Sequence, residues 1–442
     1  MKQSHCRNRI GILGPFSFGN LGNAALQEVL VQALSERFSD AEFYGCSIDL
    51  DEPAGARRIL PFPIGRHVPW PEGPTASQGV PTGAGKPQNE LSAIREWIKR
   101  TPPFSNLWRT TRATWQKTGP LREEMAFCVR AYRFAKGFRL LVVGLGGVFD
   151  EVWGGKWGDL YCIFRWAVLA RFAGTPVVYL SVGVEEINTT TAKFFCASAL
   201  LLAEYRSFRD EESKRKVEAI GVLGENHVFP DLAFGLKHRV CKGAKGTKSV
   251  GVSPMAYCDP RFWPVKDIAA YKGYVKTLAS FVSWLLHSGY EVVLFPTQIR
   301  MDRIAVQEVE ACVLENLSSN LHGKLRDVQL STVHQCLTLL SQLDVVVTSR
   351  LHGVILSSLV GTPVLALSPA TKINRLMEDM ELNHYVLDIR QIELETLING
   401  FRTLEANLED VSNKLQSKVA KYEMAVEAQF KLAFPPESAR DL

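Results

Sequence analysis

Short apolar runs alternate with amphipathic segments along most of this chain. The runs that predict buried strands are residues 9–14, 42–48, 137–144, 177–183, 250–253, 291–296, 343–348 and 363–367. Apolar residues recur at helical spacing in residues 24–38, 161–172, 190–204, 211–219, 269–286, 302–316 and 354–360. This alternation predicts an α/β fold of parallel strands with crossover helices, arranged as two doubly wound halves that face a cleft.

Two stretches interrupt the pattern and suggest how the chain divides. Residues 51–120 lose the alternation and contain a Pro- and Gly-rich part, which predicts a long insertion. Residues 237–248 are basic and contain glycine, as an interdomain linker would. We therefore predict an N-terminal Rossmann-like domain, a C-terminal Rossmann-like domain and a long amphipathic helix with a tail that straps them together, over residues 1–236, 249–400 and 401–442.

Composition narrows the class of protein. The 442 residues are 46% hydrophobic and 22% charged, as in a globular protein, and the net charge of +5 is too small for a nucleic-acid-binding surface. Nine scattered cysteines form no compact metal-binding spacing, so we expect no metal site and a reducing compartment. No apolar run is long enough to span a bilayer and the N-terminus lacks the apolar core of a signal peptide, so we expect a cytoplasmic protein.

Tryptophans are interleaved with Arg and Lys between residues 95 and 139, at Trp97, Trp108 and Trp115. Nucleic-acid binding and contact with a membrane surface both use this composition. A charged helical face over buried tryptophans explains it equally simply. We keep peripheral contact with the inner face of the membrane as an alternative and expect no nucleic acid partner.

The sequence Ser-Arg-Leu-His-Gly at residues 349–353 is the most informative motif. It lies where a predicted strand passes into a predicted helix, and such strand ends bind ligands in open α/β sheets. The guanidinium of Arg350 suits phosphate or carboxylate, and the imidazole of His352 titrates near neutral pH. A lone histidine is usually a core residue, but the nearby arginine favours an anion-binding and proton-transfer site.

Two glycine-containing loops follow predicted strands in the N-terminal half. The first carries Asn20 and Asn23, and the second carries Gly146, Gly147 and Asp150. Glycines there let backbone amides approach an anion or a sugar, and a carboxylate binds sugar hydroxyls. Plain strand-to-helix turns are the alternative for both loops.

Arg209 and Lys372 are further candidate cations. Arg209 ends a strand-like run, where it either clamps an anion or forms a salt bridge, and the adjacent Asp210 is predicted to cap helix 211–219. Lys372 follows the strand after the Ser-Arg-Leu-His-Gly motif. Its simpler interpretation is a solvated surface lysine.

These motifs, in this order, resemble the polysaccharide pyruvyl transferase family. The resemblance spans roughly residues 9–380 and is carried by residues 19–23, 146–147, 209–213, 231–234, 349–353, 361–364 and Lys372. The 349–353 motif with its downstream Pro-Val strand is fairly specific, whereas the glycine loops are not. Asn23 stands where the family usually has Asp, which leaves the acceptor open.

The resemblance implies a GT-B-like fold and a ketal-forming transferase. Such an enzyme moves the enolpyruvyl group of phosphoenolpyruvate onto two hydroxyls of a polysaccharide or lipid-linked sugar and releases phosphate, with no cofactor. It implies His352 and Arg350 as catalytic residues and a donor site of Arg209, Arg350, His352 and Lys372. The implied acceptor site comprises Asn20, Asn23, Gly146, Gly147 and Asp150.

Two other functions stay open at this point. A GT-B nucleotide-sugar glycosyltransferase or epimerase would need a carboxylate for the ribose, and Glu378 or Asp379 could supply it. A non-catalytic glycan-binding scaffold would explain Asn23 but not the retention of Arg350, His352 and Lys372.

Overall fold

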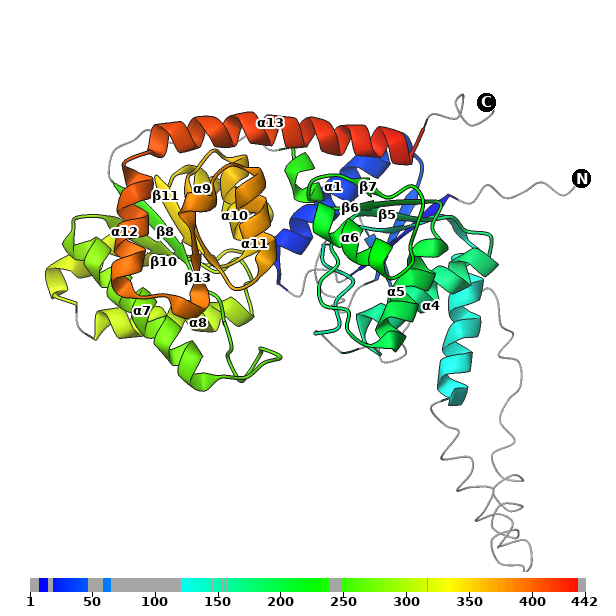
Figure 1. Ribbon diagram of the computed structural model, residues 1–442, viewed down its shortest axis with the longest axis horizontal. Coiled ribbons are helices and arrows are strands. Elements are labelled where there is room, and N and C mark those ends of the chain that lie inside the picture. Colours follow the sequence, from blue (N-terminus) through cyan, green and yellow to red (C-terminus); the bar gives the residue numbers. More distant parts are fainter. Residues whose placement is uncertain are drawn as a thin grey trace, which may run out of the picture.

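Two parallel sheets, each covered by helices, lie side by side, and one long helix runs across both (Figure 1). The computed structural model describes residues 8–14, 19–46, 59–64, 121–144, 146–152, 155, 157–237, 248–315 and 317–435. We refer to the part that carries the first sheet as the N-terminal half and to the part that carries the second as the C-terminal half.

The N-terminal half contains a seven-stranded sheet in the order β3-β2-β1-β4-β5-β6-β7, as far as the described residues show. Its strands are β1 Arg9–Leu13, β2 Glu42–Cys46, β3 Ile59–Phe62, β4 Phe138–Val143, β5 Val177–Val182, β6 Tyr205–Phe208 and β7 His227–Val228. Its helices are α1 Leu21–Arg37, residues 121–135, α4 Asp159–Phe172, α5 Thr190–Leu201 and α6 Glu211–Ala219, followed by the 3-10 helix η1 Leu232–Gly235.

The C-terminal half contains a six-stranded sheet in the order β10-β9-β8-β11-β12-β13. Its strands are β8 Ser249–Ser253, β9 Glu291–Leu294, β10 Leu325–Asp327, β11 Val345–Thr348, β12 Val364–Ser368 and β13 Val386–Asp388. Its helices are α7 Ile268–His287, α8 Met301–Leu314, α9 Val333–Ser341, α10 Leu351–Leu359, α11 Thr371–Asp379 and α12 Leu394–Glu405. β11 is fully buried between β8 and β12, as its β-branched sequence predicts.

The predicted alternation of strands and helices is confirmed. Several predicted boundaries were wrong, however, and the short strands β3, β7, β10 and β13 were not predicted. β3 lies inside the predicted insertion 51–120, most of which is outside the described residues. It contains Pro61 and sits at the sheet edge, where a missing N–H is tolerated. β7, β10 and β13 are only two or three residues long, too short to show a periodic pattern.

The predicted C-terminal helix is two helices rather than one. α12 ends at Glu405 and α13 runs over Leu408–Ala433. The break falls at Asn407, whose side-chain amide donates to the carbonyl of Thr403 and whose backbone leaves the helical region. The apolar spacing runs through this break, so it could not reveal it.

α13 spans both halves of the molecule, as predicted for a strap (Figure 1). Toward the C-terminal half, the hydroxyl of Ser412 donates to the carbonyl of Gly361 over 3.1 Å. Toward the N-terminal half, Gln429 is fully buried and its amide nitrogen donates to Ser207 Oγ over 2.7 Å. Ser181 Oγ lies 3.0 Å from Gln429 Oε1 and 2.7 Å from the carbonyl of Pro230.

A direct backbone contact also joins the halves. The amide of Leu21 donates to the carbonyl of Thr297, and the amide of Ile299 donates to the carbonyl of Gly19. Asn20 thereby forms an antiparallel bridge with Gln298. We call the region around these residues, together with Asp231 and His352, the seam.

Replacing Gln429 with Ala should destabilise the protein by about 2 kcal/mol, because Ser181 and Ser207 lose a buried hydrogen-bonding partner. Urea unfolding followed by tryptophan fluorescence measures this change. Gln416→Ala is the matched control, since Gln416 is an exposed residue of the same helix. Equal unfolding midpoints for the two variants would contradict the proposed role of Gln429.

Candidate functional site

His352 lies at the centre of the seam, in the first turn of α10. The predicted helix 354–360 begins earlier, at Leu351, so this histidine is not in a loop. Gly353 permits the early start, because a Cβ at this position would lie 2.3 Å from Thr348 Oγ1. The imidazole packs against Gly22 of α1, where a Cβ would lie 2.1 Å from the ring.

Asp231 faces His352 from the N-terminal half. Its Oδ2 lies 3.9 Å from His352 Nε2, and both atoms are buried with no hydrogen-bond partner among the described residues. The other carboxylate oxygen accepts from the amide of Ala233 over 3.0 Å, so Asp231 also caps η1. Two buried polar atoms that point toward each other form a site able to accept or hand over a proton.

The electrostatic surroundings keep the imidazole neutral. Burial lowers the pKa of His352; Asp231 opposes this shift, whereas Arg209, Lys372 and Arg350 add to it. A histidine whose pKa lies below its ordinary value is unprotonated at neutral pH. Burial and the three cations therefore favour the neutral form of the His352 imidazole.

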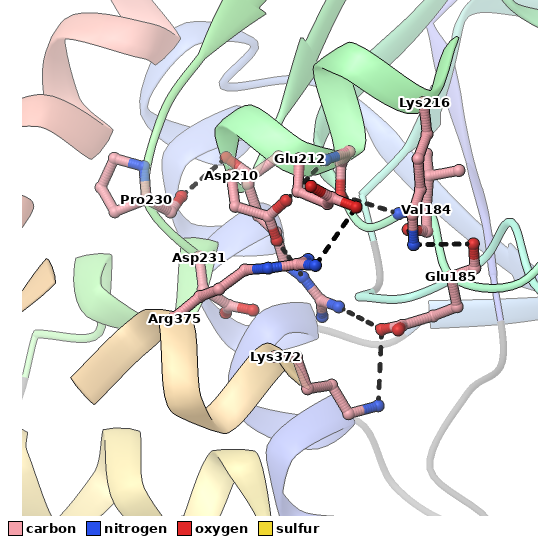
Figure 2. Close-up of polar contacts among 12 residues, drawn as sticks. Val184, Glu185, Asp210, Glu212, Lys216, Pro230, Asp231, Lys372 and Arg375 are labelled. Atoms are coloured by element: carbon pink, nitrogen blue, oxygen red, sulfur yellow. Dashed lines mark hydrogen bonds and ion pairs between the residues drawn. The ribbon is translucent and has the colours of Figure 1, made fainter. Parts of the chain in front are cut away.

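Glu185 joins the two halves through opposite charges. Its Oε1 accepts from Arg209 Nη2 over 2.5 Å and lies 3.5 Å from Lys372 Nζ, as Figure 2 shows for the lysine. Burial alone would raise the pKa of Glu185, but Lys372 and Arg209 lower it to about 2. Arg209 and Lys372, which the sequence suggested as candidate cations, thus contact the same carboxylate. The sequence did not point to that carboxylate, Glu185.

Gly183 makes room for the buried Arg209. A Cβ at Gly183 would lie 2.5 Å from Arg209 Cζ. Asp210 caps α6 by accepting from the amide of Ser213, which confirms that prediction. Arg209 also forms a salt bridge with Glu185, which is one of the two roles considered for it from the sequence.

A second ion pair crosses between α11 and α6. Arg375 Nη2 lies 3.3 Å from Glu212 Oε1, and Figure 2 shows this pair beside the contact of Lys372 with Glu185. Lys216 donates to the backbone carbonyls of Val184 and Glu185, which fixes the strand end that carries the carboxylate. Two ion pairs, Lys372 with Glu185 and Arg375 with Glu212, therefore join α11 to the N-terminal half.

Arg350 is held in place by a buried carboxylate. Its Nε and Nη2 donate to Asp302 over 2.9 and 2.6 Å, and Asp302 is fully buried and also accepts from the amide of Ala256. Trp263 lies beside the guanidinium, with its ring centroid 6.0 Å from Cζ. Within the described residues, the hydrogen bonds of this guanidinium go to Asp302 through Nε and Nη2, which leaves Nη1 without a protein acceptor there.

The residues predicted to bind the acceptor lie in two segments, at the start of α1 and in the connection between β4 and α4. Asn20 caps α1, its amide oxygen accepting from the backbone of Gly22 and Asn23. α1 thus begins three residues before the predicted start, and Asn23 lies in its first turn. Gly147 borders the Glu185–Arg209 pair, with an added Cβ 3.5 Å from Glu185.

The remaining two predicted acceptor residues lie in the β4–α4 connection. Gly146 adopts a positive φ of 75°, which glycine tolerates best. Asp150 accepts from the amide of Val152, and burial raises the pKa of its carboxyl. The charge of Lys372 acts on this carboxyl, so Asp150 belongs to the same electrostatic neighbourhood.

The carboxylates considered for a ribose lie elsewhere. Asp379 accepts from the hydroxyl of Tyr422, and its carbonyl accepts from Lys418, both on α13. Glu378 is exposed at the end of α11. Asp379 is therefore committed to contacts with α13.

Residues 20–371 match the polysaccharide pyruvyl transferase family, which is more than half of the chain. The chain belongs to that family. Its members are enzymes, and the family name implies a polysaccharide acceptor for this pyruvyl transferase. No curated protein matches the sequence.

Solved structures resemble the pyruvyl transferase in fold only. They include S. aureus MnaA with UDP, at 12% identity and a TM-score of 0.56 over 97% of each chain. UDP-GlcNAc 2-epimerase from Neisseria meningitidis bound to UDP-GlcNAc has 11% identity and a TM-score of 0.53 over 96% of this chain and 99% of that one. These neighbours show the predicted GT-B-like architecture, and their low identity carries no function across.

Two further properties bear on the site. In the part of the pyruvyl transferase that the structure describes, no three His, Cys, Asp or Glu side chains are grouped so as to hold a metal ion. Over the same residues, no helix is long and apolar enough to cross a bilayer. Trp97, Trp108 and Trp115 lie outside the described residues.

Replacing Asp231 with Asn should lower the pKa of His352 further, because the negative charge of Asp231 opposes the effect of burial. A pH titration of histidine side-chain NMR signals measures the change, with His352→Asn identifying the resonance. Glu378→Gln, at an exposed carboxylate, is the control. A raised pKa in Asp231→Asn would contradict the electrostatic assignment.

Proposed function

We propose that this pyruvyl transferase moves the enolpyruvyl group of phosphoenolpyruvate onto two hydroxyls of a polysaccharide or lipid-linked sugar. The products are a pyruvate ketal and free phosphate. The observation that carries the proposal is the placement of a buried His352 among Arg209, Arg350 and Lys372 in a chain of this family. A donor with both a phosphate and a carboxylate requires cations at more than one point.

The three cations divide the work of donor binding. Arg350, oriented by Asp302, presents its Nη1 to one anionic group of the donor. Arg209 and Lys372 receive the other, and there the donor competes with Glu185 for the same charges. The free energy of donor binding is then the difference between pairing these cations with the donor and pairing them with Glu185.

His352 is proposed as the base for the attacking hydroxyl. It takes the hydroxyl proton as the sugar oxygen bonds to C2 of the donor, while C3 gains a proton to become the methyl group. Attack by the second hydroxyl closes the ketal as the C2–O bond to phosphate breaks. The two hydroxyls lose two protons in total. One is equivalent to the proton that C3 gains, and the other leaves with phosphate.

Asp231 is proposed to stabilise the imidazolium that forms when His352 accepts the proton. Its Oδ2 faces His352 Nε2, and its charge already raises the pKa of the imidazole against burial. A donor phosphate bound nearby would shift that pKa in the same direction. We place the donor on the C-terminal half and the acceptor on the N-terminal loops with Asn20, Asn23, Gly146, Gly147 and Asp150.

His352→Asn should reduce phosphate release from phosphoenolpyruvate in the presence of an acceptor glycan by about 10²–10⁴-fold, the usual contribution of a general base. Coupled detection of phosphate measures the rate. His384→Asn, at an exposed histidine of the same half, should retain it.

Thermal-shift measurements separate the alternatives. Stabilisation by phosphoenolpyruvate supports the proposal, whereas stabilisation by UDP- or GDP-sugars alone would favour the nucleotide-sugar enzyme. Glycan binding without phosphate release by the wild type would favour the scaffold.

Gly22→Ala should preserve the helix but lower activity at least roughly tenfold, because the new methyl group would occupy the space of the His352 ring. Alanine is the better helix former, so circular dichroism should show no loss of helix. Gly273→Ala is the matched control, since a Cβ there meets nothing within 4 Å. Full activity in Gly22→Ala would show that the position of the imidazole is not critical.

A further inference from the structure

Three helices on the outside of the N-terminal half expose large apolar side chains. They are residues 121–135, α4 with the turn before it, and α5. We call the following residues the apolar face: Leu121, Met125, Val129, Trp157, Phe172, Phe194 and Leu201. Phe172 is 77% exposed, Trp157 62% and Phe194 58%, which is unusual for aromatic side chains of a folded domain.

Aromatic contacts join α4 and the turn before it to α5. Trp157 packs edge-on against Tyr161, with ring centroids 5.4 Å apart, and Phe164 of α4 contacts Phe194 of α5 at 5.7 Å. Figure 1 shows α4 and α5 side by side on this part of the molecule. Ring contacts through Phe195 also connect Trp157 with Phe194, and Phe172 and Leu201 are the last residues of the same two neighbouring helices.

The helix 121–135 extends this surface. Glu124 accepts from Tyr161 and pairs with Arg165, both on α4, so the two helices are joined by partly buried polar contacts. The exposed Leu121, Met125 and Val129 are four residues apart and therefore line one side of their helix. The apolar face thus takes its exposed residues from three neighbouring helices.

The charges around the apolar face are mainly positive. Among the described residues of the three helices, the exposed charged side chains are Arg122, Glu123, Arg130, Arg133, Arg171 and Lys193. Five of these six are basic. An isologous contact with a second copy of the chain would bring like charges together, whereas an anionic surface would complement them.

We propose that the apolar face docks on an anionic lipid bilayer. Exposed Trp and Phe side chains favour the boundary between headgroups and acyl chains, and surrounding Arg and Lys are attracted to anionic headgroups. Trp157 follows the loop that carries Asp150, so the docked face adjoins the connection between β4 and α4. The inference does not depend on the proposed reaction, because binding is measured without substrate.

Co-sedimentation with vesicles tests the proposal. The full-length protein should bind vesicles that contain phosphatidylglycerol and should bind pure phosphatidylcholine vesicles much more weakly, and added salt should weaken the binding. This comparison uses the wild type and requires no variant to fold.

Substitutions then locate the surface. The double variant Phe172→Glu with Phe194→Glu should lower the partition coefficient at least roughly tenfold, given the apolar area that two phenylalanines bury. Met424→Glu is the matched control, since Met424 is 72% exposed on α13. It should leave binding unchanged, and circular dichroism checks that each variant folds.

Three results would overturn the proposal. One is wild-type protein that fails to sediment with phosphatidylglycerol vesicles, and another is a double variant that binds as strongly as Met424→Glu. The third is a dimeric mass in light scattering that the double variant abolishes while vesicle binding persists, which would assign the apolar face to a second copy of the chain.

Discussion

The need to neutralise buried charge governs how the two halves meet. Arg209 is buried at a strand end of the N-terminal half, where a bare guanidinium would cost several kcal/mol. Glu185 supplies the opposite charge, and Lys372 of the C-terminal half shares it. Arg209 and Glu185 both belong to the N-terminal half and pair there, whereas Lys372 reaches this carboxylate only when the two halves lie together. Gly183 is part of the same solution, since only a residue without a side chain leaves room for Arg209.

The position of Asp231 depends on a residue almost two hundred positions later. Gln429 of α13 contacts Ser181 and Ser207, and Ser181 also contacts the carbonyl of Pro230, directly before Asp231. Ser181 has a positive φ of 45°, a backbone conformation that is unfavourable for serine and is held by these bonds. The strap helix therefore stabilises the segment that brings a carboxylate to His352, in addition to connecting the two halves.

The sequence predicted the alternation of strands and helices because burial imposes a period on each element. It also predicted the cap by Asp210, since capping depends on a few neighbouring residues. It could not predict that Glu185 joins Arg209 to Lys372, or that Asp302 lies beneath Arg350, because these contacts arise from tertiary packing across distant segments. The positions of Arg350 and His352 were anticipated from the strand-to-helix motif, but their buried partners were not.

Asn23 lies in the first turn of α1, on the side of the N-terminal half that meets His352. It directly follows Gly22, which packs against the His352 ring. The Asp that the family resemblance leads us to expect at this position would add a negative charge on this side, whereas the neutral Asn23 leaves Asp231 as the carboxylate that faces the ring from the N-terminal half. The substitution thus acts in the same direction as burial and the surrounding cations, toward a neutral histidine. On the proposed mechanism, a neutral residue 23 keeps His352 unprotonated but lowers the basicity of the ring, so Asp231 is left to stabilise the imidazolium.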